Sequence, residues 1–374
     1  MIKKLSTLNS QLSILNSQLP TLLLLLLLLL LLLAACEPEK PAPTDNADTT
    51  PPAPADRIAY LLNEGWWGNN NAEISLINIT RQTIDPDWFS RVNGRGLGDV
   101  AQDLLHYGSR LYCTVWNSGT LEVINPATGK SIKQIDFASR GPRYIAADDG
   151  KLYVSCYDRS VVRIDTATLQ IEASCPLPGK QPEQLCICGD NIVVCNSWDY
   201  APDGTTTLYD STVSVINLAT FTTTDRITVG TNPTRILPLD NNRCIVACAG
   251  NYGSETPSAK VLDLSTRQLT PLDQAATGMD KHDGSLYHYI TTYDAYWNPT
   301  ALFFRTDLQS LQSTPILTSL SIPYAYGITI DPLSGNLLIC NSPYTTAGDL
   351  YSYSPDGTLL WQTEARFYPQ KVVF

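Results

Sequence analysis

Histidine and methionine are scarce in this sequence, with three histidines and two methionines among 374 residues. The patterns typical of nucleophile elbows, zinc proteases, phosphate-binding loops and dinucleotide-binding folds are missing as well. His282 and His288 lie close together, but a turn sequence separates them. Acidic residues are scattered among turn residues. We therefore expect no catalytic residues, no metal site and no resident cofactor.

Basic residues are also in the minority, because 25 Lys and Arg oppose 36 Asp and Glu for a formal net charge of −11. Proteins that bind nucleic acid or anionic lipid headgroups rely on clustered positive charge. The balance argues against both kinds of partner.

Long apolar runs are missing except for one, Leu22–Leu33. Twelve helical residues rise only about 18 Å, whereas the hydrocarbon core of a bilayer is roughly 30 Å thick. With Lys3 and Lys4 before it and small residues after it, the run is typical of a signal peptide over residues 1–35. Its end, Leu33-Ala34-Ala35-Cys36, resembles a bacterial lipobox, which implies lipidation of Cys36. An ordinary secretory signal is the alternative.

The segment 36–55 contains six prolines and almost no apolar residues. It cannot bury enough surface to offset its ordering entropy, so we predict a disordered tether behind the lipidated cysteine. Two acyl chains give stable anchoring, which one chain alone would not. We expect a protein held at the outer membrane by its lipid only, exposed at the cell surface.

The remaining chain, 56–374, contains a repeat with few amphipathic helical windows. A short apolar strand ending in Asn, Asp or Ser before a turn occurs seven times, at spacings of 47, 40, 52, 46, 44 and 47 residues. These copies end at Asn78, Asn125, Asp165, Asn217, Asp263, Asp307 and Ser354. A second marker, an apolar strand that ends in a polar or aromatic loop, precedes each copy. A period in the forties predicts an all-β fold, a seven-bladed β-propeller with four antiparallel strands per blade.

The two ends of this region predict how the ring closes. The first unit, residues 57–89, supplies only three strands, and residues 369–374 form a lone apolar strand after the seventh unit. We expect this last strand to become the innermost strand of blade one, which leaves no open sheet edge.

Cysteine occurs ten times, and nine cysteines remain if Cys36 is lipidated. Most of the nine lie in β-like apolar runs, which favours small buried side chains over disulfides. Cys186 and Cys188 share one face of a strand, but their spacing is not that of a zinc site.

The loops between the second and third strands of the units are rich in aromatic residues, although loops that face water are usually polar. These loops and the connections between units emerge on the same rim of a propeller. Aromatic faces together with amides suit a large, partly apolar ligand that forms hydrogen bonds. Tryptophans packed between blades and asparagines that cap turns are the structural alternative. The predicted ligand-binding residues are Trp66, Trp67, Asn69, Trp116, Asn117, Arg143, Tyr157, Asn196, Trp198, Tyr200, Tyr252, Trp297 and Tyr344.

The stretch Asn63-Glu-Gly-Trp-Trp-Gly-Asn-Asn-Asn71, followed by 97–103 and 108–112, resembles the opening of the YncE-like surface lipoproteins of Bacteroidetes. The similarity extends through 121–129 and loosely to the C-terminus. Within this family the chain is similar to the members that capture cobalamin. The resemblance implies cobalamin or a related large nutrient as the bound ligand, a TonB-dependent outer-membrane receptor as partner, and no catalysis.

Two other functions are compatible with the sequence. An adhesion or scaffold propeller would use the same aromatic rim to bind a protein. Lactonases, streptogramin lyases and quinone-dependent dehydrogenases also use seven-bladed rings, but they need acid clusters, a metal-bound water or a histidine base at the funnel.

Overall fold

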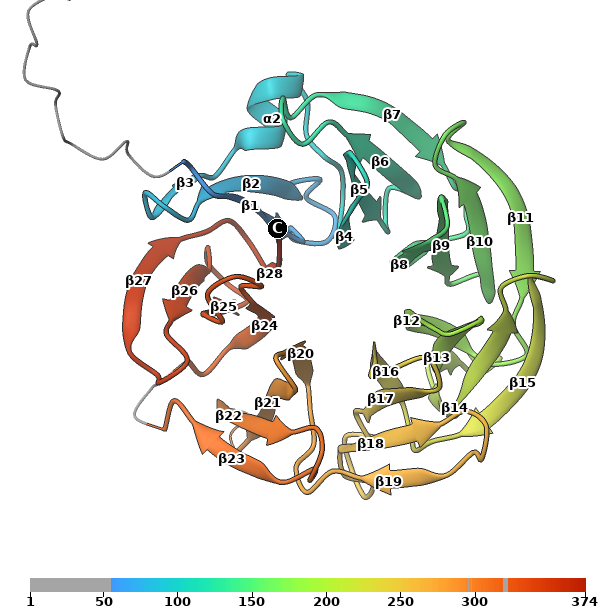
Figure 1. Cartoon of the computed structure of the whole chain (residues 1–374). Coiled ribbons are helices and arrows are strands. Elements are labelled where there is room, and N and C mark those ends of the chain that lie inside the picture. Colours follow the sequence, from blue (N-terminus) through green and yellow to red (C-terminus); the bar gives the residue numbers. More distant parts are fainter. Residues whose placement is uncertain (1–54, 295, 297, 319–321) are drawn as a thin grey trace, which may run out of the picture. The chain divides into compact units, whose positions relative to one another are not determined.

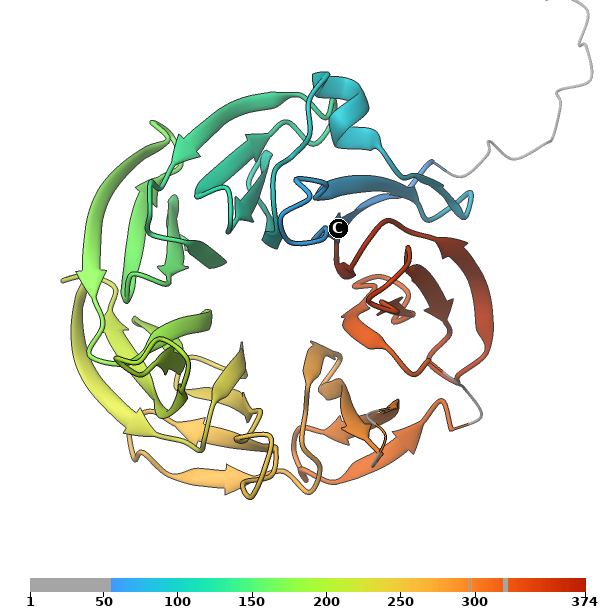
Figure 2. The same ribbon diagram turned by 180° about the vertical axis from the view of Figure 1, so that it is seen from behind.

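The computed structural model describes residues 55–294, 296, 298–318 and 322–374. These residues form seven separate four-stranded antiparallel sheets, which surround a common centre like the blades of a propeller (Figure 1). The repeat therefore predicted the fold correctly, with one sheet for each copy. Figure 2 shows the same ring from behind.

Within every blade the strands follow one another from the centre of the ring outward (Figure 1). Blade 1 consists of β28 (Pro369–Val373), β1 (Ile58–Asn63), β2 (Glu73–Asn78) and β3 (Thr83–Asp85). Blade 2 consists of β4 (Ala101–Tyr107), β5 (Arg110–Val115), β6 (Thr120–Ile124) and β7 (Ser131–Asp136). Blade 3 consists of β8 (Pro142–Asp148), β9 (Lys151–Cys156), β10 (Ser160–Asp165) and β11 (Gln170–Pro176).

The other four blades repeat this order. Blade 4 consists of β12 (Gln181–Cys188), β13 (Asn191–Tyr200), β14 (Thr207–Asn217) and β15 (Thr222–Thr228). Blade 5 consists of β16 (Pro233–Pro238), β17 (Arg243–Cys248), β18 (Ser258–Asp263) and β19 (Leu269–Pro271). Blade 6 consists of β20 (Gly278–His282), β21 (Ser285–Tyr293), β22 (Pro299–Asp307) and β23 (Ser313–Ile316). Blade 7 consists of β24 (Ala325–Ile330), β25 (Leu337–Asn341), β26 (Asp349–Tyr353) and β27 (Leu359–Glu364).

The C-terminal strand closes the ring, as predicted. β28 pairs antiparallel with β1, with Leu61 opposite Val372, and so becomes the innermost strand of blade 1. Lys371 in β28 forms an ion pair of 2.7 Å with Asp103 of blade 2. On the other side of blade 1, Arg57 holds Asp331 of blade 7 through two hydrogen bonds of 2.7 and 2.8 Å. Both neighbours of blade 1 are therefore tied to it by buried carboxylates.

Apolar side chains pack between neighbouring sheets, so each blade is stabilised by the blades beside it. One such layer lies between blades 4 and 5 and contains five cysteines, Cys186, Cys188, Cys195, Cys244 and Cys248. All nine cysteines of the described residues are free and buried, which confirms their predicted role as small core side chains. Burial raises the pKa of the Cys188 thiol to about 12 and that of Cys248 to about 11.

Two local features differ from the sequence prediction. A short helix, α2 (Trp88–Asn93), follows β3, buries Trp88 and Phe89, and ends at Gly94 in a left-handed conformation with φ of 65°. The segment 196–210, which contains Trp198 and Tyr200 of the predicted aromatic loops between second and third strands, is mostly strand, because β13 and β14 continue into it and pair Trp198 with Tyr209. Aromatic and β-branched residues on both arms favour this extended hairpin.

No helix within the described part of the chain is long and apolar enough to cross a membrane.

Candidate functional site

Six of the seven innermost strands carry a β-bulge near their first residues. In β4, for example, Ala101 pairs with Val115 and Asp103 with Thr114, so Gln102 is an extra residue without a partner. The same one-residue excess occurs in β8, β12, β16, β24 and β28, and β20 has no such shift. A bulge bends its strand and changes the direction of a side chain.

The bulges lie at one end of the ring, where a cavity of about 700 Å³ opens. Each of the six bulged strands contributes residues at its bulge to the lining of this cavity: Gln102, Arg143, Tyr144, Glu183, Thr234, Arg235, Tyr326 and Gln370. The end of β21 and the loops β17–β18 and β21–β22 complete the wall with residues such as Thr292, Tyr252, Glu255 and Asp294. The cavity is therefore a funnel on the rim predicted to bind a ligand, displaced toward blades 5 and 6.

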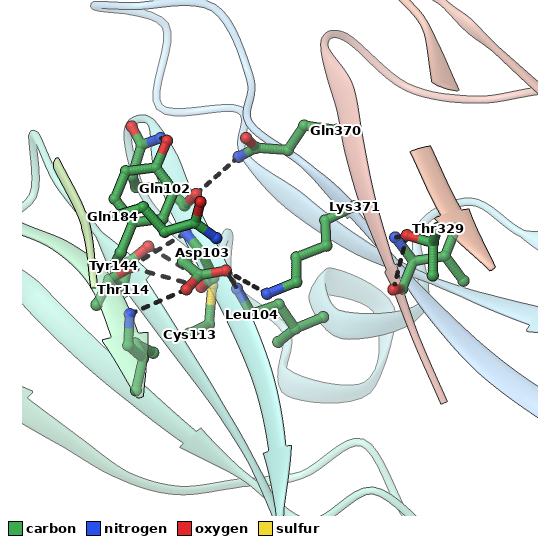
Figure 3. A network of polar contacts seen from close by, with 12 residues as sticks. Gln102, Asp103, Leu104, Cys113, Thr114, Tyr144, Gln184, Thr329, Gln370 and Lys371 are labelled. Atoms are coloured by element: carbon green, nitrogen blue, oxygen red, sulfur yellow. Dashed lines mark hydrogen bonds and ion pairs between the residues drawn. The ribbon is translucent and has the colours of Figure 1, made fainter. Parts of the chain in front are cut away.

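A network of hydrogen bonds links the floor residues of different blades (Figure 3). Gln370 donates from Nε2 to the carbonyl oxygens of Ala101 (2.8 Å) and Gln102 (3.1 Å). Gln102 in turn donates from Nε2 to the Tyr144 hydroxyl at 3.0 Å. The floor is thus held by contacts between blades, which makes it rigid.

Arg143 is the most extensively paired cation of the funnel. Its Nη2 donates to both carboxylate oxygens of Glu183, at 2.9 and 3.1 Å, and its Nη1 donates to Gln102. Tyr157 also donates to Glu183, and the guanidinium carbon lies 4.5 Å from the centre of the Tyr157 ring. Burial opposes the charged form of Arg143, but the Glu183 carboxylate outweighs burial and raises the pKa of Arg143.

Glu64 reaches the same cavity from the loop after β1. Its carboxylate accepts a hydrogen bond of 2.6 Å from the Tyr326 hydroxyl. Burial raises the pKa of Glu64, although Tyr326, Arg143 and Arg235 act in the opposite direction. The funnel therefore contains a carboxyl group that gains a proton more readily than an exposed one.

Three of the predicted ligand-binding residues line the cavity: Trp116, Arg143 and Tyr252. The Trp116 ring lies on one side of the Arg143 guanidinium, whose central carbon is 5.5 Å from the ring centre. Tyr252 is 71% exposed and stands at the mouth of the funnel.

A second group of predicted residues forms an aromatic chain beside the cavity. Tyr157 contacts Trp116 at 5.8 Å between ring centres and Trp198 at 6.1 Å, and Trp198 contacts Tyr200 at 5.1 Å. Tyr344 belongs to a separate cluster, 6.1 Å from the cavity residue Tyr326. These rings extend the aromatic surface from the funnel over the rim of the neighbouring blades.

The structure places the other predicted residues away from the cavity. Trp66 packs against Phe367 and Tyr368, whereas Trp67 is 67% exposed. The side chain of Asn69 donates to the carbonyl of Trp67, and that of Asn117 to Asp99. Trp297 and Cys36 lie outside the described residues.

Asn196 is completely buried at the point where β13 leaves the ring. Its Nδ2 donates to the hydroxyls of Thr212 and Ser214, and its Oδ1 accepts from Ser214. These contacts hold β13 to β14, and no atom of the amide faces the funnel.

Sequence analysis missed most of the funnel floor: Glu64, Gln102, Tyr144, Glu183, Tyr326 and Gln370. A signal for them exists, because proline stands directly before the two bulge residues in β8, β12, β16 and β28. Proline is tolerated at the first position of a strand, where its missing N–H is not needed. Pro-x-x-apolar, repeated at the blade period, therefore marks the residues that face the funnel.

Within the described residues, no three His, Cys, Asp or Glu side chains are placed to hold one metal ion. The chemistry of the funnel is that of hydrogen bonds, aromatic faces and charge.

These observations define the chain as a seven-bladed β-propeller with a funnel of aromatic and polar residues on one rim. No protein-family model matches the sequence. No curated protein matches it either. Among solved structures, the computationally designed protein Ika8 is similar over 83% of this chain and 89% of its own, with 13% identity and a TM-score of 0.54. Hydrazine synthase from Kuenenia stuttgartiensis is similar over 66% of this chain and 74% of its own, with 14% identity and a TM-score of 0.53. At these identities the likeness concerns the fold alone.

Proposed function

We propose that this chain is an outer-membrane surface lipoprotein that binds cobalamin or a related large nutrient at the funnel and passes it to a TonB-dependent transporter. The observation that carries the proposal is the 700 Å³ cavity, whose floor consists of bulge residues from six blades. Concave sites with aromatic walls and a few fixed polar groups are the usual form of small-molecule sites. The residues 63–71, which carry the resemblance to YncE-like lipoproteins, bring Glu64 into this cavity.

The proposal is a binding function without catalysis, and the histidine positions support it. His288 is fully buried between the Ala275 carbonyl and the Thr306 hydroxyl, and burial lowers its pKa. The Nδ1 of His106 is 2.9 Å from the carbonyl oxygen of the last residue, Phe374. His106, His282 and His288 are all absent from the lining of the funnel.

A rigid site favours tight binding, because little conformational freedom is lost when the ligand arrives. Hydrogen bonds between blades hold the floor before any ligand binds. The aromatic chain beside the cavity provides further contact area for a ligand wider than the funnel. A corrin ring with amide side chains offers both the apolar faces and the polar edges that such a surface would contact.

The test uses the chain from residue 37 onward with cyanocobalamin. The purified protein should keep the red colour through gel filtration and give a calorimetric binding signal at micromolar concentration. Tyr252→Ala should weaken binding roughly tenfold or more, as loss of a well-packed aromatic contact does. Leu333→Ala is the matched control, because Leu333 is 78% exposed but lies in the β24–β25 turn at the opposite end of the blades. A colourless protein without a calorimetric signal would reject this cargo.

A protein partner is the second candidate, and one observation favours it. Trp67, Tyr252 and Tyr296 are 67%, 71% and 86% exposed. Exposed aromatic side chains in such number suit a protein interface. If cyanocobalamin fails to bind and Trp67→Ala abolishes association with a co-purifying outer-membrane receptor, this candidate replaces the first.

A further inference from the structure

Arg143 and Arg235 are the two cations that line the funnel, and their surroundings differ. Arg143 is paired with Glu183 and Gln102. Arg235 donates only from Nη1, to the Tyr144 hydroxyl at 2.7 Å and to the Thr234 carbonyl at 3.3 Å. Within the described residues, no carboxylate forms an ion pair with Arg235, and its Nε and Nη2 have no acceptor.

An arginine carries five N–H donors in a fixed plane, and most of those of Arg235 remain unused. A partly buried cation is costly unless it is paired. Glu183 and Glu64 act on Arg235 only through space, since Glu183 pairs with Arg143 and Glu64 accepts a hydrogen bond from Tyr326. The Tyr144 ring fixes the guanidinium, since its centre lies 5.3 Å from the central carbon of Arg235. The free edge is thus held in a defined position.

Tyr144 has an unused donor of its own. Its oxygen accepts hydrogen bonds from Gln102 (3.0 Å) and Arg235 (2.7 Å), so both of its acceptor positions are occupied. The hydroxyl hydrogen has no acceptor among the residues that the structure describes. Tyr144 is 6% exposed and lines the cavity, so an acceptor for this hydrogen would have to lie in the cavity.

Building on the proposed function, we propose that the ligand carries an anionic oxygen group, a carboxylate or phosphate, which binds at the funnel floor to Arg235 and the hydroxyl of Tyr144. Guanidinium and an O–H donor side by side match two oxygens of one such group. The anion supplies both a direct ion partner for Arg235 and an acceptor for the hydroxyl hydrogen of Tyr144.

The acids of the cavity restrict the anion to this one position. Glu183 is neutralised by Arg143, and Glu64 accepts a hydrogen bond from Tyr326. Glu255 and Asp294 lie on the loops β17–β18 and β21–β22 at the mouth. A ligand with negative charge on its outer parts would be repelled there, so we infer one anionic group at the inner end of an otherwise neutral molecule.

The experiment compares pyrenebutyrate with pyrenebutyramide, two fluorescent compounds that differ only in the charge of one group. Both are titrated into the chain from residue 37 onward and into R235Q, R235K and R159Q. Arg159 is the matched control, because it is a partly exposed arginine on the same rim that pairs with Asp199 and does not line the cavity. Melting temperatures of all variants show that each one is folded.

We expect the wild-type protein to bind the acid more tightly than the amide. R235Q should weaken binding of the acid roughly tenfold to hundredfold, as loss of a charge-assisted hydrogen bond does, and leave the amide within about twofold. R235K should restore part of the affinity for the acid, and R159Q should behave as wild type.

Equal affinity for acid and amide, or an equal loss in R235Q and R159Q, would overturn the inference. The inference would also be overturned if neither pyrene compound bound and R235Q bound cyanocobalamin as tightly as the wild-type protein does. If the acid binds through Arg235 but cyanocobalamin does not bind, the corrinoid is the wrong cargo and the anion site stands. The two proposals therefore fail separately.

Discussion

Removal of residues 370–374 should open the ring. The deletion takes away the pairing of β28 with β1, in which Tyr60, Leu61 and Leu62 face Val373, Val372 and Lys371. It also removes the buried Val372 side chain and the ion pair between Lys371 and Asp103. The truncated chain would expose the edge of β1 to water.

The magnitude follows from these contacts. Burial of a valine side chain stabilises by about 2 kcal/mol, and each lost backbone hydrogen bond costs about 1 kcal/mol. The Asp103 side chain is 5% exposed and keeps hydrogen bonds from the backbone of Leu104 and Ile145, but the loss of its ion partner costs about 3 kcal/mol. The total reaches the range of the whole stability of a typical domain, about 5–15 kcal/mol.

The assay is urea and thermal unfolding, followed by circular dichroism, of chains ending at residues 374 and 369. Val372→Ala in the full chain serves as an intermediate step, with an expected loss of about 2 kcal/mol. The truncated chain should melt more than about 10 °C lower or fail to fold, because a domain of this size loses about 2–4 °C per kcal/mol. A melting temperature equal to that of the full chain would refute the reasoning, since the ring would then be closed without β28.

Three further predictions concern charge and thiols. Burial opposes ionisation of Asp331, but hydrogen bonds from Arg57 and the backbone lower its pKa from 3.8 to about 2. The ionised Asp331 therefore stabilises the folded protein above pH 4, and this contribution is lost as the pH falls toward 2. Asp331→Asn should therefore lose about 1–2 kcal/mol in urea unfolding at pH 7 and show a flatter acid dependence between pH 4 and 2; an unchanged dependence would contradict this. Glu183→Gln leaves Arg143, whose side chain is 12% exposed, without its carboxylate and should cost about 3 kcal/mol in the same assay, whereas a wild-type midpoint would disprove the pairing. Ellman's reagent should label none of the nine cysteines of the native ring and all nine in guanidinium, and fast labelling of the native protein would show that the thiols are accessible.

The fold was predictable because each blade repeats the same local chemistry. Asn78, Asp165 and Asp263 each end the third strand of a blade, where the side chain of each accepts backbone hydrogen bonds from the next turn. The position of the last strand was predictable because the first unit has only three strands and β28 follows the seventh unit, so β28 completes blade 1. Helix α2 was not predictable, because its six residues are too few for a helical period to be visible in the sequence.

The site was less predictable, because its residues come from innermost strands that are far apart in the chain: Gln102 and Gln370 are in contact although 268 residues separate them. The sequence predicts aromatic loops on the rim where the cavity opens, but it does not distinguish the rings that turn inward: Trp116 lines the cavity, while Trp66 packs against Phe367. Asn196 is a second example. The sequence does not distinguish an asparagine that contacts a ligand from one that, as here, holds two strands together.

At the bulges, residues that line the funnel lie outside the strand pairing that holds each blade together. The extra residue of each bulged strand has no partner in the ladder, so its exchange leaves the register and the alternation of buried side chains unchanged. Exchange of Gln102, Thr234, Tyr326 or Gln370 therefore keeps the strand pairing of the ring, whereas the hydrogen bonds that the side chains of Gln102, Tyr326 and Gln370 form across the floor would be lost. A change of specificity needs no new loop and no insertion, and a library randomised at these sites would sample new ligands on one constant scaffold.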